Sequence, residues 1–186
     1  HQDAERGLFL MRVEWDLAGF RLDLAEFDRR FAPVADRFTM RYRVERSAKP
    51  YRVAVFVSKY DHCLMDLLYR HHTGELACDV PLVVSNHPDA EKWAAFYKVP
   101  FHVVAVDKGD KAAAEEKQLA LLADRQIDLV VLARYMQVLS PRFVEAYPQR
   151  VINVHHSFLP AFSGARPYHR AFERGVKLIG ATSHYV

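Results

Sequence analysis

An asparagine and two histidines stand close together after an apolar run, in the stretch Val151 to Pro160. The run is typical of a buried strand, and side chains alternate along a strand, so Asn153 and His155 are expected on the same side. An imidazole exchanges protons near neutral pH and an amide can stabilise an oxyanion, so the pair suits attack on a carbonyl carbon. A core histidine beside a capping asparagine is the alternative interpretation.

Further polar side chains follow an earlier predicted strand that ends at Val57. Lys59 and His62 are expected either at the rim of a pocket or in solvent, with Ser58 or Asp61 capping the next helix. The loop contains no glycine. Phosphate and dinucleotide loops need glycine for close approach of the backbone, so this loop argues against those ligands.

A second loop, Arg134 to Leu139, lies between a predicted strand and a helix that begins at Ser140 and Pro141. Serine followed by proline is a typical helix start. The loop keeps large apolar and polar groups together. Met136 and Leu139 could therefore belong either to the core or to a binding surface.

Two other chemistries are disfavoured. His155, His156 and His169 could be imagined around zinc, but adjacent histidines on a strand point to opposite sides, and no HExxH motif or cysteine cluster accompanies them. Neither Cys63 nor Cys78 lies in an activating motif, and no GxSxG sequence is present. We therefore predict no metal and no cysteine or serine nucleophile.

Strand and helix patterns alternate around these residues. Predicted strands occupy 51–57, 80–85, 101–106, 129–133, 151–154 and 178–182, with helices near 62–72, 88–96, 110–125, 141–147 and 166–174. Short valine-rich strands that alternate with helices predict an α/β fold with a doubly wound, mostly parallel sheet. Ligands of such sheets lie beyond the carboxyl ends of the strands, where the loops considered above begin.

The first part of the chain has a different pattern, with predicted strands at 8–15 and 38–45 around a helix at 24–35. Asp23 and Glu26 form a capping-box-like pair at the helix start, and Pro33 is expected to kink or end the helix near Ala32. A polar stretch at 46–50 then predicts a domain boundary, with one domain at 1–48 and another at 49–186.

Composition limits the class of protein. The chain has 186 residues, 51% of them hydrophobic, and a net charge of +3 without a basic block, which predicts a globular protein that does not bind nucleic acid. No run approaches the ~18 to 20 apolar residues of a membrane span, and no leader opens the chain. Two unrelated cysteines suit a reducing compartment, so a cytoplasmic location is expected. The first residue is His1 and the last segment is strand-like, so we expect a fragment.

The segment Asn153 to Phe162, NVHHSFLPAF, resembles the folate-dependent formyltransferase family, and Pro167 to His169 and Gly180 to Thr182 continue the match. The resemblance covers nearly the whole chain and implies a Rossmann-type, formyltransferase-like domain at 49–186 that lacks its C-terminal end. The paired histidines, the Ser58 to Cys63 loop and an N-terminal unit that looks like half an ACT domain are most similar to the deformylase branch of that family.

The resemblance implies roles for particular residues. Asn153 and His155 match the catalytic pair, and a third catalytic residue, an aspartate, is expected beyond residue 186. A pocket rim is implied at Lys59, His62 and His156. The loop that grips the pterin ring of the folate is implied at Arg134, Tyr135, Met136, Gln137, Val138 and Leu139.

The implied reaction is hydrolysis of 10-formyltetrahydrofolate to formate and tetrahydrofolate, supplying formate for purine synthesis and balancing the one-carbon pool. No cofactor is implied beyond the folate substrate. A homo-oligomer is expected, with glycine or methionine as an effector of the ACT-like unit. Two alternatives stay open: formyl transfer to an amine, such as phosphoribosylglycinamide or a charged tRNA, and a non-catalytic amino-acid sensor.

Overall fold

The computed structural model describes residues 2–3, 7–9, 11–44, 50–107, 109–155, 167–176 and 180–186. The chain divides into two compact units, His1–Ser47 and Ala48–Val186.

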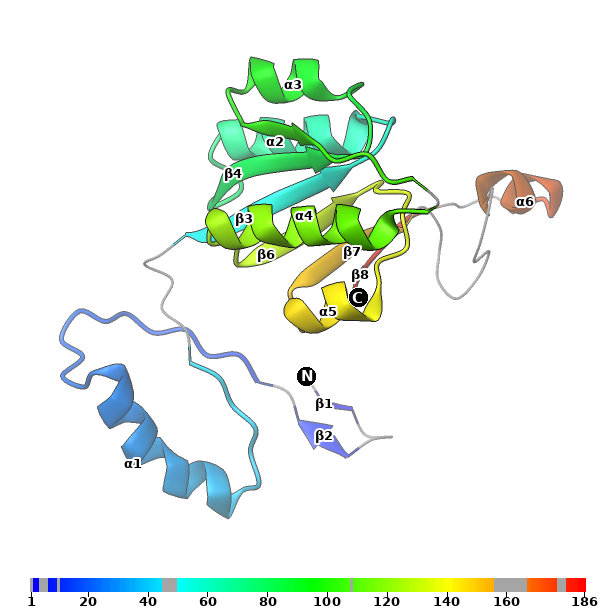
Figure 1. The fold of residues 1–186 in the computed structure, drawn as a ribbon. Coiled ribbons are helices and arrows are strands. Elements are labelled where there is room, and N and C mark those ends of the chain that lie inside the picture. Colours follow the sequence, from blue (N-terminus) through cyan, green and yellow to red (C-terminus); the bar gives the residue numbers. More distant parts are fainter. Residues whose placement is uncertain are drawn as a thin grey trace. The chain divides into compact units, whose positions relative to one another are not determined.

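The larger unit is built on a six-stranded sheet in the order β5–β4–β3–β6–β7–β8 (Figure 1). Strands β3 to β7 pair in parallel, and β8 pairs with β7 in the antiparallel direction. The predicted doubly wound, mostly parallel sheet is therefore confirmed. The strands are β3 Tyr51–Val57, β4 Cys78–Ser85, β5 Phe101–Val103, β6 Leu129–Ala133, β7 Val151–His155 and β8 Thr182–Tyr185.

The bounds of two predicted strands were wrong. β5 ends at Val103 and not at residue 106, because Val103 pairs with Ser85, the last residue of its partner β4. The last strand starts at Thr182, where the prediction had it end. Antiparallel pairing places Thr182 opposite His155 and fixes the register of β8, which period-two alternation alone does not reveal.

Helices cover both faces of this sheet. α2, His62–His72, and α3, Glu91–Phe96, share one hydrophobic cluster with Val53, Val55 and Val57 of β3. α4, Lys111–Asp124, and α5, Pro141–Ala146, pack against the opposite side chains of the same strand, including Phe56 (Figure 1). Burial on both faces explains why the strands are near-continuous apolar runs, as is usual in parallel sheets.

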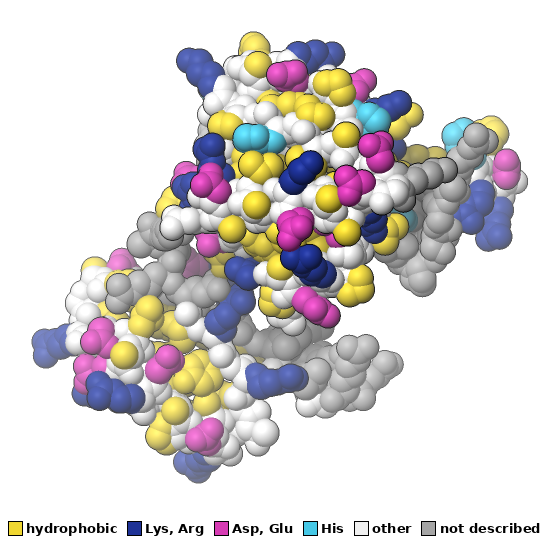
Figure 2. All heavy atoms as spheres, viewed as in Figure 1, with side chains coloured by type: hydrophobic (Ala, Val, Ile, Leu, Met, Phe, Trp, Pro, Cys, Tyr) yellow, Lys and Arg dark blue, Asp and Glu magenta, His cyan; other side chains and the backbone are white. Residues whose placement is uncertain are grey.

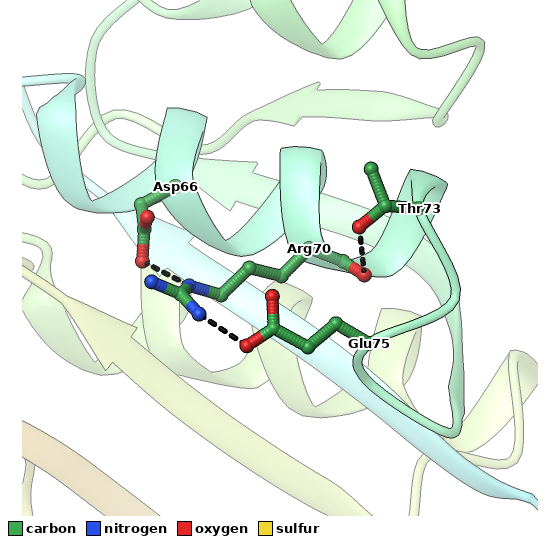
Figure 3. Close-up of polar contacts among 4 residues, drawn as sticks. All are labelled: Asp66, Arg70, Thr73 and Glu75. Carbon is green, nitrogen blue, oxygen red and sulfur yellow. Dashed lines mark hydrogen bonds and ion pairs between the residues drawn. The ribbon is translucent and has the colours of Figure 1, made fainter.

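The end of α2 is held by an ion-pair network (Figure 3). Arg70 Nε donates to Asp66 Oδ2 at 2.9 Å, and another nitrogen of the same guanidinium pairs with Glu75. Thr73 Oγ1 donates to the Arg70 carbonyl at 3.1 Å. These groups are exposed to solvent, where ion pairs contribute little to stability, so they shape the turn into β4 more than they stabilise the fold.

An apolar cavity of about 300 Å³ opens beside that turn. Its lining includes Leu67 of α2 and Tyr51, Cys78 and Leu129, which are the first residues of β3, β4 and β6. The cavity therefore lies toward the amino ends of the strands, away from the edge where ligands of doubly wound sheets bind.

The smaller unit is built around α1, Leu24–Arg37, and a short antiparallel pair, β1 Gln2–Asp3 and β2 Leu8–Phe9. The predicted cap is confirmed, because Asp23 Oδ1 accepts a hydrogen bond from Glu26 N at 2.7 Å. An aromatic row runs along the unit: ring centroids lie 5.6 Å apart for Trp15 and Phe27, 5.4 Å for Phe27 and Phe31, and 4.8 Å for Phe31 and Tyr42.

Two predictions for this unit were wrong. The helix does not end near Ala32 but continues through Pro33 to Arg37, and Ala35, one turn beyond Phe31, is buried. Packing of that face offsets the hydrogen bond that proline removes. In addition, residues 11–15 of the predicted strand 8–15 and residues 38–44 of the predicted strand 38–45 form no strand, although Leu8–Phe9 does; residues 10 and 45 lie outside the described residues. A strand requires a ladder partner, and within the described residues of this unit these segments pair with none.

Basic and acidic side chains are interspersed with apolar ones on the face of the molecule shown in Figure 2. This mixed pattern agrees with the absence of a basic block in the sequence. Within the described ranges, every helix is too short or too polar to cross a membrane.

Candidate active site

Four strands bring their carboxyl ends to the same edge of the sheet. Val57 of β3 pairs with Ser85 of β4 on one side and with Ala133 of β6 on the other. On the next strand, Asn153 of β7 pairs with Leu132 of β6. The loops after these strands therefore begin side by side, and they carry most of the residues that the sequence singled out.

Asn153 and His155 occupy alternate positions on β7. Both project to the face that Val151 occupies, and Val151 is buried under α5 in the cluster that contains Phe143. Asn153 and His155 are themselves only half-buried, whereas the Nε2 atom of the His155 ring is buried. His156, the third polar residue predicted here, lies outside the described residues.

The antiparallel strand β8 adds His184 directly opposite Asn153. Asn153 Nδ2 lies 3.2 Å from His184 Nε2, and His184 Nδ1 lies 2.9 Å from the Tyr185 carbonyl oxygen. A carbonyl can only accept, so Nδ1 carries the proton, and in the neutral ring Nε2 accepts from the Asn153 amide. The amide is thereby oriented, and its second N–H is directed elsewhere.

The loop 134–139 leaves β6 with a sharp change of direction. Arg134 has φ +59°, in the left-handed region, which non-glycine residues rarely adopt. Its guanidinium carbon lies 4.9 Å from the centroid of the Tyr60 ring, in the loop after β3. Arg134 Nε is buried and has no hydrogen-bond partner among the described residues. A donor of this kind is available to a ligand acceptor.

Side chains in the loop alternate between core and surface. Tyr135 is buried with its ring edge-on to Phe56, at a centroid distance of 5.2 Å, and Leu139 packs against the same cluster. Met136 and Val138 point outward, with 54% and 82% of their surface exposed. The core interpretation was thus wrong for Met136 and right for Leu139. Between the buried anchors, the exposed residues Met136 and Val138 place this stretch at the surface, at the carboxyl edge of the sheet.

Ser58 ties this loop to two others. Its hydroxyl donates to Asn86 Oδ1 at 2.7 Å, after β4, and accepts from Met136 N at 3.1 Å. Ser58 therefore does not cap α2, contrary to one of the two interpretations of the sequence. The N-cap position belongs to Asp61, whose side chain makes no capping bond and instead accepts from Trp93 Nε1 at 2.6 Å.

Two residues of α4 contact the loop from the core side. Gln118 Nε2 donates to the Tyr135 hydroxyl at 2.8 Å, and Glu115 Oε1 accepts from Ser140 N at 2.9 Å. Burial raises the pKa of Tyr135 to about 12, an effect that the Gln118 hydrogen bond partly offsets. The hydroxyl is therefore neutral throughout the physiological range.

Comparison with known proteins identifies the family. The sequence model of the formyl transferase family, described as "Formyl transferase", matches residues 51–186. This chain belongs to that family.

Individual relatives in the formyl transferase family extend the comparison. A formyltetrahydrofolate deformylase from Synechocystis sp. is 50% identical over 185 residues, covering 100% of this chain and 65% of the relative. The crystal structure of a formyltetrahydrofolate deformylase from Pseudomonas syringae has a TM-score of 0.92 and 47% identity, covering 100% of this chain and 62% of that chain. This chain therefore spans less than two thirds of either protein.

A second type of family member is similar over a shorter range. The crystal structure of glycinamide ribonucleotide transformylase 1 from Geobacillus kaustophilus has a TM-score of 0.70 and 36% identity, and covers 74% of this chain and 74% of its own. The likeness to the deformylases therefore includes the N-terminal unit, whereas the likeness to this transformylase covers less of the chain.

The remaining predicted residues lie at the same edge in this formyl transferase fold. Lys59 and His62 are exposed, in the loop after β3 and at the start of α2. Cys63 follows, and burial raises the pKa of its thiol, although the nearby Arg134 charge offsets part of the effect. A raised pKa lowers the thiolate fraction and disfavours a nucleophilic role.

No group of three or more His, Cys, Asp or Glu with the spacing of a metal site occurs in the part of the chain that the structure describes. That part excludes His156, one of the histidines considered for zinc.

Several residues that shape the site were missed at the level of sequence. His184 stands in an alternating segment, and only the antiparallel partner reveals that it meets Asn153. Gln118 and Glu115 lie in a predicted helix, where polar residues are usually solvated. Asn86 offered a weak signal, because it directly follows a strand in the way that Ser58 and Arg134 do.

Proposed function

We propose that the whole protein hydrolyses 10-formyltetrahydrofolate to formate and tetrahydrofolate. The observation that carries the proposal is the position of Asn153 and His155 on one face of β7, beside the loop 134–139 at the carboxyl edge of the sheet. An amide donor and an imidazole beside an accessible loop suit attack by water on a formyl carbon.

In the proposed mechanism, the oxygen of water attacks the formyl carbon, and the Asn153 amide donates a hydrogen bond to the oxygen that becomes negative. His155 accepts a proton from the water and delivers a proton to N10 of the folate as the carbon–nitrogen bond breaks. Formate and tetrahydrofolate leave, and no redox change occurs. The loop 134–139 holds the pterin through its backbone, with Lys59, His62 and His156 at the rim of the pocket.

Water is proposed as the acceptor in preference to a phosphorylated amine. The loop after β3 has no glycine, and its Ser58 hydroxyl is already bonded to Asn86 and Met136. The loop therefore lacks the glycine-lined backbone cradle in which a phosphate usually binds. The likeness to deformylases over the whole of this chain supports the same choice. Formyl transfer to phosphoribosylglycinamide is the second candidate, supported by the glycinamide ribonucleotide transformylase likeness.

The proposal extends to the N-terminal unit, as part of an ACT-like regulatory domain that binds an amino acid such as glycine or methionine and joins copies of the protein in a homo-oligomer. Its exposed apolar side chains, including Phe9, Met11 and Val13, support an assembly role. A cytoplasmic enzyme of this kind supplies formate for purine synthesis and balances the one-carbon pool.

The test is incubation of the full-length protein with 10-formyltetrahydrofolate, with and without glycinamide ribonucleotide, while formate is measured. We expect formate release without the amine, at the same rate in the presence of a chelator. If formylated amine forms, and no formate is released when the amine is omitted, the reaction is formyl transfer and not hydrolysis. Binding of glycine or methionine without turnover of 10-formyltetrahydrofolate would favour the amino-acid sensor.

A further inference from the structure

Glu115 and Gln118 are polar residues on the core side of α4. They are 7% and 1% exposed, and they share their face of the helix with the buried residues Ala114 and Leu122. Three-residue spacing places both side chains on one side of a helix. An apolar residue would fill either position without the cost of burying a polar group, so core packing alone does not account for them.

Their partners define what they do. Gln118 bonds the hydroxyl of Tyr135 and Glu115 bonds the backbone N–H of Ser140, one at each end of the loop 134–139. Gln118 Oε1 is buried and has no hydrogen-bond partner among the described residues. The contact with Tyr135 therefore leaves a buried acceptor unsatisfied, which lowers the stability of the fold. Lys111 Nζ lies 3.8 Å from Glu115 Oε1 and balances its charge.

We propose that Glu115 and Gln118 are positioning residues that fix the conformation of the ligand loop. They hold its two ends from the core side, while Ser58 holds Met136 N from the loop after β3. The stretch between these anchors then presents a preformed backbone to the ligand, which lowers the ordering cost of binding. The inference rests on the proposed function, because it takes the pterin of a folate as that ligand.

A positioning role predicts a specific kinetic effect. Asn153 and His155 belong to β7, so loosening the loop should weaken binding of the folate more than it slows the chemical step. Losing one anchor should raise KM by about 10-fold, with kcat changed by less than about 3-fold, since a tenfold change corresponds to the loss of roughly one hydrogen bond, and the charged acceptor Glu115 should have the larger effect.

The experiment uses the full-length protein, four single variants and one double variant. Glu115→Met and Gln118→Met remove the anchors and keep the volume of the side chains. Glu115→Gln retains an oxygen that can accept from Ser140 N, so it should restore most of the affinity. Glu116→Met is the matched control, because Glu116 is exposed on the same helix and pairs with Arg142 at 3.2 Å.

Two measurements are made on each variant. Amide hydrogen exchange over 135–140 without ligand reports the anchoring, and steady-state kinetics with 10-formyltetrahydrofolate report KM and kcat. We expect faster exchange and a raised KM for Glu115→Met and Gln118→Met, with Glu115→Gln and Glu116→Met close to the wild type.

A double variant separates positioning from stability. Gln118→Met with Tyr135→Phe removes both polar partners, so the melting temperature should recover while KM stays high. Recovery of KM together with the melting temperature would overturn the proposal, as would unchanged exchange and KM in both single methionine variants. If the wild type itself does not bind 10-formyltetrahydrofolate, the proposed function fails first, and the positioning of a folate fails with it.

Discussion

Asn153 of β7 and His184 of β8 face each other across directly paired positions, with Nδ2 and Nε2 3.2 Å apart. One amide proton of Asn153 is thereby committed to the ring, and in the proposed mechanism the other donates to the substrate oxygen. In the proposed mechanism, His184 would therefore act on the reaction through Asn153.

Replacement of His184 with Ala should free the Asn153 amide to rotate. We expect kcat to fall by roughly 10-fold with KM little changed, since an oxyanion donor works only when it is preorganised. Steady-state kinetics of the full-length protein test this. The double variant with Asn153→Ala should be no slower than Asn153→Ala alone, and an additive loss would show that His184 acts independently of Asn153.

Substitutions of Asn153 and His155 should change kcat and the pH profile in different ways. His155→Ala removes the proton-transfer group, so kcat should fall by on the order of 10² to 10⁴ and the pH profile should lose one ionisation. Asn153→Leu removes an oxyanion donor, so we expect a loss of roughly 10² to 10³ without a shift of the profile. Measured pH–rate curves separate the two. Val154→Ala, which lies on the opposite face of β7, is the control.

Tyr135 should make the protein sensitive to alkali. Its pKa is raised to about 12 in the folded state, against 10.0 for a free tyrosine, so both states are neutral below pH 10 and no stability is lost there. Between pH 10 and 12 the unfolded state ionises more readily, and the folded state should lose roughly 3 kcal/mol. Urea unfolding of wild type and Tyr135→Phe across this range tests the effect. Equal slopes against pH would contradict it.

The cysteines should be dispensable for turnover. Burial raises the pKa of both Cys63 and Cys78, so little thiolate is present near pH 7. Cys63→Ala and Cys78→Ala should keep kcat within about 2-fold, with a stability loss on the order of 1 kcal/mol from the space left behind. Formate assays and thermal melts measure the two quantities. If the correctly folded Cys63→Ala variant is inactive, Cys63 becomes a candidate nucleophile for covalent catalysis.

The sheet was predictable because its strands are buried on both faces. The stretch 53–57 of β3 and the whole of β6 are apolar on both faces and rich in valine, and helices separate the strands along the chain. The strand order and the direction of β8 follow from long-range pairing, which local patterns do not encode. The helix through Pro33 shows the same limit, because packing of the aromatic row outweighs a local rule.

The candidate site was predictable where residues stand at the ends of strands. Asn153, His155 and Arg134 have this placement, and the carboxyl-edge rule points to them. Gln118 and His184 could not be found in this way, because the role of each depends on a contact with a residue distant in the sequence. Gln118 contacts Tyr135, and His184 contacts Asn153.

The position of β3 in the sheet has a consequence for the order in which the chain can fold. β3 pairs with β4 nearby in the sequence, but its other neighbour, β6, begins 72 positions after β3 ends. At typical rates of translation this interval lasts on the order of 10 s. One edge of the most buried strand therefore stays open on the ribosome until β6 emerges. Aggregation of the nascent chain should be governed by that edge, and the candidate active site cannot form before it closes.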